Sequence, residues 1–436
     1  MQTIYSKLLM NIKKQPLIWG FALLYVLPPI GMAWLLFFGI NQTIQMIRQR
    51  KRQALDPISL LFLLAVTASV GATFVNRQLM DLLSVLMIAA FYGIYLYLYH
   101  HPEKLYFRQY TWLVIWGGIY LFVSDKIFSL IDHWVSIPAA VSIMTGHLLL
   151  GYNNFTRLYG SAYNPNYACY LLVLSLSFLL VEILRTLKLR NYHSISLMLL
   201  LVAALDLGIY ETGSRAGFMI MIGLHLMFFL LYNKWAFGGV TALMVILTPI
   251  IYHWMPRAGS TEMSLSTRLV IWKNSFFIFM QHPIFGTTSL GFPDAYVSAT
   301  GRNLSHPHNL FLAVFTSSGI VCGLLFTAIV TISAYFLIRA FRQDKRNRHK
   351  TTLFLFALPT ILEYGIMDFT LSSPQVMLVV LALAAFWIRY LRQKGWLRNF
   401  HSILLPHGRF RKVKSIPRAK RRSALALAAD SLSRKG

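Results

Sequence analysis

The chain has 436 residues, of which 56% are hydrophobic and only 13% are charged. Soluble domains of this size are rarely so apolar, and many of its apolar runs approach the ~20 residues that a helix needs to cross a bilayer. The formal net charge of +27 comes from lysine and arginine clusters between apolar runs. This distribution favours cytoplasmic loops and contact with anionic membrane lipids over nucleic-acid binding. The composition therefore predicts an all-α, polytopic integral membrane protein with about 10–12 transmembrane helices.

The first half of the chain alternates apolar runs with short polar loops. Residues 17–40 are interrupted by Pro28-Pro29, so this run is either one kinked span or two short ones. Further spans are predicted at 57–76, 79–99 and 110–124. Residues 125–163 have mixed polarity and are predicted to lie at the outer face, in part as a re-entrant segment.

The second half contains the remaining predicted spans, at about 163–184, 195–212, 216–232, 237–255, 310–338, 352–369 and 374–391. The run 310–338 exceeds one bilayer thickness, so its first turns are expected to lie at the surface or to re-enter. The basic runs 185–190 and 339–350 are predicted inside. We expect a membrane domain of residues 1–391 and a basic cytoplasmic tail of residues 392–436.

A polar segment of about residues 256–309 forms the predicted large external loop and the predicted catalytic region. Hydroxyl side chains at 264–267 are candidate N-caps for a helix that starts near Arg268. Apolar side chains then recur at helical spacing, at Leu269, Trp272, Phe276 and Phe279. This pattern predicts an amphipathic helix in the plane of the interface, which ends before Pro283.

Histidines stand at the end of this segment. Pro307 is typical of a helix start, which would place His308 in the first turn of the next helix. The local positive dipole disfavours imidazolium there, and a neutral histidine can accept a proton from a hydroxyl. His306 is interpreted as structural. Metal binding is the minor alternative, because no cysteine or evident carboxylate pair completes a ligand set.

External loops are usually poor in arginine, yet Arg157, Arg215, Arg257, Arg268 and Arg302 all fall in predicted external segments. For Arg257 and Arg302, snorkelling from helix ends explains the position as well as a function does. Arg215 lies in a turn of small residues, where backbone N–H groups and a guanidinium can converge on a phosphate. Arg268, at a predicted helix start, is a similar case. A pair of such arginines fits the diphosphate of a lipid headgroup.

Carboxylates also occur within or beside the apolar spans, at Asp206, Glu211, Glu363 and Asp368. Intramembrane carboxylates are functional candidates by default, although they can also serve only to pair with arginines. Glu211 is close in sequence to Arg215, so a pair between these two side chains is predicted.

Short motifs follow one another in a distinctive order between residues 157 and 323. They are Asn164-Pro165-Asn166, Thr212-Gly213-Ser214-Arg215-Ala216-Gly217, Thr267-Arg268-Leu269 followed by Trp272, His282-Pro283-Ile284-Phe285-Gly286, and His306-Pro307-His308-Asn309. Together they resemble the O-antigen ligase/polymerase superfamily of bacterial membrane glycosyltransferases. Gly319 also fits the ligase pattern, but Cys322 stands where ligases have a small residue, which affects the ligase subtype rather than the family.

The resemblance implies a metal-independent glycosyltransferase without a cofactor. Its donor would be a glycan on undecaprenyl diphosphate, its acceptor a glycan or lipid-glycan, and its place the outer face of the bacterial cytoplasmic (inner) membrane. His308 would be the general base, Arg215 and Arg268 would hold the diphosphate, Arg157 would line the donor or acceptor groove, and Asn309 would orient histidine or sugar. Other polysaccharide-assembly membrane proteins are candidate partners. The alternative is a flippase or transporter of lipid-linked oligosaccharide, which would use the same arginines without a base.

Overall fold

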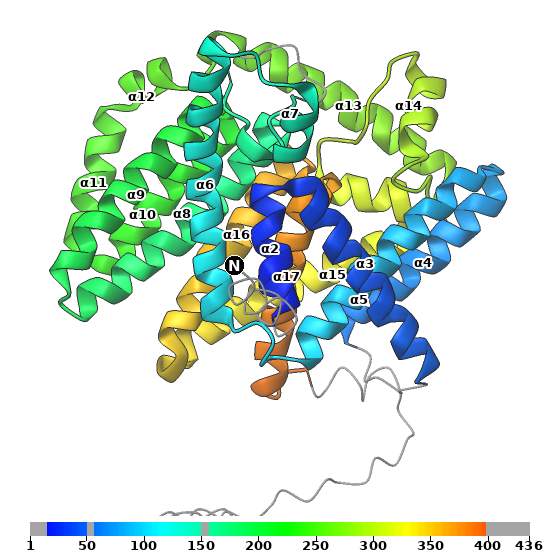
Figure 1. Cartoon of the computed structure of the whole chain (residues 1–436), viewed down its shortest axis with the longest axis horizontal. Helices are drawn as coiled ribbons and strands as arrows, with labels where there is room; N and C mark the ends of the chain where they lie inside the picture. Colours follow the sequence, from blue (N-terminus) through cyan, green and yellow to red (C-terminus); the bar gives the residue numbers. More distant parts are fainter. Residues whose placement is uncertain (1–14, 50–55, 150–156, 398–436) are drawn as a thin grey trace, which may run out of the picture. The chain divides into compact units, whose positions relative to one another are not determined.

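The computed structural model describes residues 15–49, 56–149 and 157–397, with the side chains of 260–264 left aside. These residues form α-helices joined by loops and short 3-10 turns, and no strand occurs among them. The predicted all-α class is therefore confirmed (Figure 1).

The helices follow in chain order as α2 (Pro16–Val26), α3 (Pro28–Arg48), α4 (Pro57–Asn76), α5 (Leu82–His100), α6 (Phe107–Trp134), α7 (Ala139–Thr145), α8 (Pro165–Lys188), α9 (Tyr192–Glu211), α10 (Arg215–Tyr232), α11 (Lys234–Ile246), α12 (Thr248–Trp254), α13 (Thr261–Gln281), α14 (Phe292–Thr300), α15 (Leu310–Gln343), α16 (Arg348–Met367) and α17 (Pro374–Gln393).

Nine helices in the described part of the chain are long and apolar enough to cross a membrane, or ten if α11 and α12 are counted as one bent span. Ten spans lie at the lower limit of the predicted 10–12, and nine lie one below it. The difference has local causes. The predicted span 237–255 is two helices bent by 69°. In α16, Lys350 and Glu363 lower the mean hydropathy of a helix that was predicted to span.

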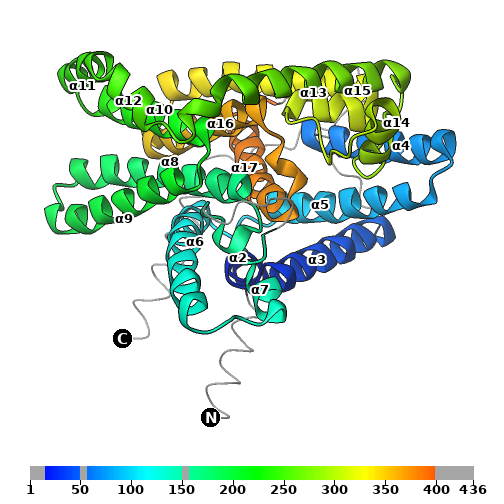
Figure 2. The same ribbon diagram turned by 90° about the horizontal axis from the view of Figure 1, so that it is seen from above.

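Helix α8 lies at the centre of the helix bundle. Its span is 94% buried, and α6, α9, α10 and α16 pack against it. Helices α16 and α17 lie between the group around α8 and the group formed by α3, α4 and α5, as Figures 1 and 2 show. Because α8 and α16 both carry site residues at one end, this packing fixes the site inside the helical bundle rather than on a free loop.

Proline and glycine account for two breaks in the helices. The run 17–40 is two helices, because the chain leaves helical geometry at Leu27 before Pro28. Helix α15 is interrupted at Gly319, where φ is 76° and ψ is −178°. A Cβ at Gly319 would meet the Ile284 carbonyl oxygen at 2.0 Å, so both the backbone conformation and the space require glycine. The first turns of α15 are thus separate from its long second part.

The polar segment before residue 309 differs from the prediction at the start of its helix. Helix α13 begins at Thr261, well before Arg268, so the predicted start was wrong. Apolar side chains lie on more than one side of α13, because Leu269 and Phe276 are exposed while Ile271 and Ile278 are buried. Exposed apolar side chains are compatible with contact to lipid, so the position of α13 in the plane of the interface stays a prediction.

Candidate functional site

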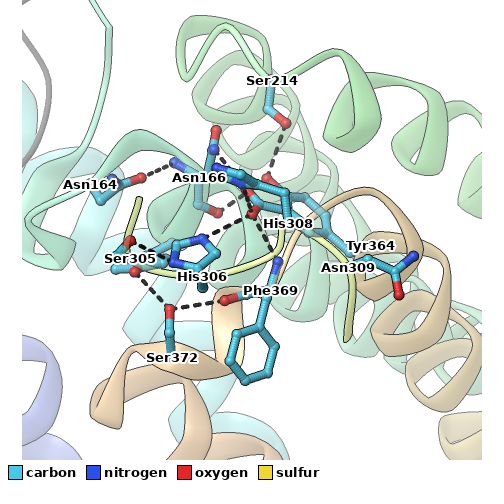
Figure 3. Close-up of polar contacts among 12 residues, drawn as sticks. Asn164, Asn166, Ser214, Ser305, His306, His308, Asn309, Tyr364, Phe369 and Ser372 are labelled. Atoms are coloured by element: carbon cyan, nitrogen blue, oxygen red, sulfur yellow. Dashed lines mark hydrogen bonds and ion pairs between the residues drawn. The ribbon is translucent and has the colours of Figure 1, made fainter. Parts of the chain in front are cut away.

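The site is organised around the carboxylate of Asp368, which follows α16 and is only 3% exposed. Its Oδ1 lies 2.7 Å from His308 Nδ1 and 3.4 Å from His306 Nε2. Its Oδ2 accepts a 2.7 Å hydrogen bond from the side-chain amide of Asn166. Figure 3 shows Asn166, His306 and His308 close together, beside Phe369, the residue that follows Asp368. Of the intramembrane carboxylates singled out from the sequence, Asp368 is thus the one that contacts the predicted base.

Asp368 is held in its ionised form. Burial alone raises the pKa of this carboxyl, but hydrogen bonds and positive charge from His306 and His308 outweigh burial and hold the pKa well below its usual range. An ionised carboxylate only accepts hydrogen bonds, so the Nδ1 of His308 carries a proton toward it. In a neutral ring this leaves the lone pair on Nε2, which makes His308 a suitable proton acceptor.

The backbone at His308 is not the predicted helical one. His308 has φ of 52°, in the left-handed region, and α15 begins only at Leu310. Asn309 is the N-cap, and its Oδ1 accepts a 3.0 Å hydrogen bond from the amide of Leu312. The prediction that His308 lies in the first turn of a helix is therefore wrong, and so is the dipole argument built on it. The neighbouring group that acts on the imidazole is Asp368.

Two further hydrogen bonds hold the backbone around His308. The indole Nε1 of Trp272 on α13 donates to the His308 carbonyl at 3.2 Å. The side-chain amide of Asn309 donates to the Ile366 carbonyl at 3.0 Å, which ties the start of α15 to the end of α16. Trp272 and Asn309 thus fix a left-handed residue that would otherwise be unfavourable.

His306 belongs to the same cluster. Its Nδ1 lies 2.8 Å from Ser305 Oγ, and its side chain is 12% exposed. The ligand atoms of His306, His308 and Asp368 all lie within 4.8 Å of one another, a spacing that can hold a metal ion. The sequence showed no evident carboxylate pair for a ligand set, and the single carboxylate Asp368 was not recognised there because it is 60 residues beyond His308 and reaches it only through the fold.

Arg157 joins the cluster through Asn166. The Arg157 side chain is buried, its Nη2 donates to Asn166 Oδ1 at 3.0 Å, and its Nε donates to the Thr212 carbonyl at 2.6 Å. The Tyr364 hydroxyl donates to the Asn166 carbonyl and contacts Ser214 Oγ. Asn166 was visible in the sequence only as part of a motif, and Tyr364 carried no sequence signal.

Three of the other predicted arginines lie at or near the turn before α10, whereas Arg302 is exposed after α14. Arg215 Nη1 donates to the Arg257 carbonyl at 3.2 Å, and Arg257 Nε donates to the Gly213 carbonyl at 2.8 Å. Arg268 on α13 is close enough for its positive charge to act on Arg215. Three guanidinium groups from separate segments therefore lie in one region. Glu211, which was predicted to pair with Arg215, forms an ion pair with Lys126 of α6.

A cavity of about 740 Å³ adjoins this region. Arg157, Gly213 and Arg257 line one part of it, so the cavity lies between the arginine turn and the buried Arg157 side chain. The other lining residues include carboxylates, hydroxyls and aromatic rings, among them Asp132, Tyr159, Tyr210 and Glu211. Its mixed lining can bind a polar ligand with hydroxyl groups.

Comparison with known families agrees with the motifs. Residues 195–327 match the O-antigen ligase family model, and no curated protein matches the chain. The matched segment contains Arg215, Arg268, His308 and Asn309, whereas Asp368 lies beyond it. The ordered motifs and the helical membrane fold agree with this match. Residues 195–327 of the chain are therefore similar to the O-antigen ligase family of membrane proteins.

Proposed function

We propose that this protein transfers a glycan from undecaprenyl diphosphate to a sugar acceptor at the outer face of the cytoplasmic membrane, as a polysaccharide polymerase or as an O-antigen ligase. The observation that carries the proposal is the 2.7 Å contact between His308 Nδ1 and Asp368 Oδ1. A histidine oriented by a buried carboxylate is an arrangement that supports general-base catalysis.

In the proposed reaction, Nε2 of His308 takes the proton of an acceptor hydroxyl while that oxygen attacks the anomeric carbon of the donor glycan. The bond between the anomeric carbon and the diphosphate oxygen breaks, and undecaprenyl diphosphate leaves with the electron pair. Asp368 stabilises the imidazolium that forms. Such proton transfer typically contributes about 10²–10⁴-fold in rate.

Arginine side chains hold the leaving group. Arg215 and Arg268 lie close enough to repel each other, and a bound diphosphate would relieve that repulsion. Guanidinium groups bind phosphate oxygens in a bidentate manner, which also orients the donor. Because negative charge grows on the leaving diphosphate, the contact between arginine and diphosphate is stronger in the transition state than in the bound donor. It therefore accelerates the reaction.

The 740 Å³ cavity beside Arg157 and Arg257 is the proposed position of sugar units. Carboxylates such as Asp132 accept hydrogen bonds from sugar hydroxyls, and aromatic rings such as Tyr210 offer a flat apolar surface. Arg157 lies between this cavity and Asn166, so it connects sugar binding to the hydrogen bonds that position Asp368.

No metal is needed in this proposal. Both oxygens of Asp368 already accept hydrogen bonds from the protein, since Oδ1 also receives the amide of Phe369 at 2.8 Å. The three-residue group of His306, His308 and Asp368 supports metal binding as a competing arrangement, which a measurement of activity in excess EDTA tests.

A flippase or transporter of lipid-linked oligosaccharide is the competing function, and it would need no base. Purified protein in detergent micelles separates the two, because micelles have no second compartment to receive a transported lipid. We expect lipid-linked glycan and acceptor to give a longer glycan and free undecaprenyl diphosphate, both visible by mass spectrometry. Transport in proteoliposomes without any such product would contradict transfer.

A further inference from the structure

A second cavity lies at the opposite end of the two helices that carry the site. Helix α8 starts beside Asn166 and ends at Lys188, and α16 starts at Arg348 and ends beside Asp368. These helices pack against each other. Twenty-four helical residues in α8 extend about 36 Å, which is comparable to the ~30 Å hydrocarbon core of a bilayer. The second cavity and the catalytic cluster therefore face opposite leaflets of the bilayer.

The cavity has a volume of about 210 Å³ and is lined by the cationic side chains of Arg185, Lys188 and Arg348 together with His349. The first two come from the end of α8 and the last two from the start of α16, so both predicted inside basic runs contribute to one site. The start of α16 adds the positive end of its helix dipole.

A buried carboxylate holds two of these side chains in place. Glu182 is 3% exposed within α8, and its carboxylate lies 3.3 Å from Arg185 Nη1 and 2.9 Å from His349 Nε2. A carboxylate inside a membrane span is costly unless it is paired. Glu182 therefore fixes Arg185 and His349 at the rim of the cavity. Lys188 and Arg348 add positive charge beside them.

Apolar side chains complete the lining. Val181, Leu184, Leu189 and Leu231 belong to the same cavity, and Leu189 is largely exposed. Cations beside the exposed Leu189 and the other apolar lining residues match an amphiphile with a negative headgroup and an acyl chain. Basic pockets between transmembrane helices at the cytoplasmic side are typical binding places for anionic lipid headgroups.

We propose that this cavity binds the phosphate headgroup of an anionic phospholipid from the cytoplasmic leaflet. The ligand chemistry is a phosphodiester with an attached acyl chain. Because α8 and α16 each join this cavity to the catalytic cluster, the bound lipid stabilises the two helices that hold Asn166 and Asp368 in position. The proposal does not depend on the nature of the transfer reaction.

The test uses the full chain in nanodiscs of neutral phosphatidylcholine, with and without added phosphatidylglycerol. We expect phosphatidylglycerol to raise the thermal unfolding midpoint by several degrees, and native mass spectrometry to show a retained anionic lipid. The variant Lys188→Gln/Arg348→Gln should lose both effects. A matched control, Lys345→Gln/Arg346→Gln, removes two exposed charges from the neighbouring 3-10 turn and should keep both.

Each other outcome counts against the proposal. Suppose that Lys188→Gln/Arg348→Gln, the cavity variant, and Lys345→Gln/Arg346→Gln, the control, lose stabilisation and lipid retention equally. The lipid would then be attracted by surface charge alone. Full retention in the cavity variant would place the lipid elsewhere. Equal stabilisation by inorganic phosphate would assign the cavity to a free anion rather than to a lipid. If the cavity variant is too unstable for its thermal unfolding midpoint to be measured, lipid retention by the single variant Lys188→Gln gives the same comparison.

Discussion

Asn166 and Asp368 are joined by a 2.7 Å hydrogen bond between the Nδ2 of one and the Oδ2 of the other, across 202 residues of sequence. This bond leaves Oδ1 of Asp368 for His308. On its other side, Asn166 accepts a hydrogen bond from Arg157, which lines the large cavity. His308, the proposed base, is therefore positioned by a continuous set of hydrogen bonds that starts at the proposed sugar-binding cavity.

The first prediction concerns Asp368→Asn, which keeps the shape of the side chain but removes its charge. The amide can no longer favour the proton on Nδ1 of His308 or stabilise the imidazolium. We expect kcat for glycan transfer to fall by at least about 10²-fold, with little change in the KM for donor. The control is Asp294→Asn, which alters an exposed carboxylate on α14. Equal effects of the two variants would rule out a positioning role.

The second prediction concerns pH. Because the pKa of Asp368 is held well below its usual range, this carboxylate stays ionised in mild acid. We expect the rate of transfer to fall reversibly as the pH is lowered, because a protonated base cannot take the proton of the acceptor hydroxyl. A pH profile that stays flat down to about pH 4.5 would show that no histidine acts as base.

The fold and part of the site could be predicted from the sequence. Apolar runs and basic loops define the spans, and arginines in predicted external loops single out Arg215 and Arg268, whose role stays a prediction. The partners of Asp368 could not be predicted, because they are 60 and 202 residues away and meet it only through helix packing. The left-handed backbone of His308 was also beyond prediction, since residues other than glycine rarely adopt it.

The third prediction concerns the arginines. Arg215→Ala and Arg268→Ala should each reduce product strongly while protein level stays near normal, because each removes a bidentate contact to the diphosphate. Lysine at either position should restore activity only in part, since it lacks the guanidinium fork. Arg302→Ala removes another arginine from the same external segment and serves as the control. Wild-type yields from both alanine variants would refute the diphosphate contact.

The fourth prediction concerns topology. A cysteine that replaces Ser298 on α14 should react with an impermeant maleimide from outside intact cells, whereas one that replaces Lys345 should react only after lysis. Both positions are exposed, and the natural Cys169 and Cys322 are buried, so background labelling should be low. The expected pattern follows from the basic bias of the loops. The reverse pattern would move the catalytic cluster to the cytoplasmic side.

The most direct test of the account is transfer by purified enzyme with lipid-linked glycan and acceptor, in excess EDTA, for the wild type, His308→Ala and His306→Ala. The account predicts that wild-type activity persists in EDTA, that His308→Ala binds donor normally but transfers at least about 10²-fold more slowly, and that His306→Ala is much milder. Complete loss of wild-type activity in EDTA, restored by a divalent ion, would contradict it and make His306, His308 and Asp368 the ligands of a catalytic metal.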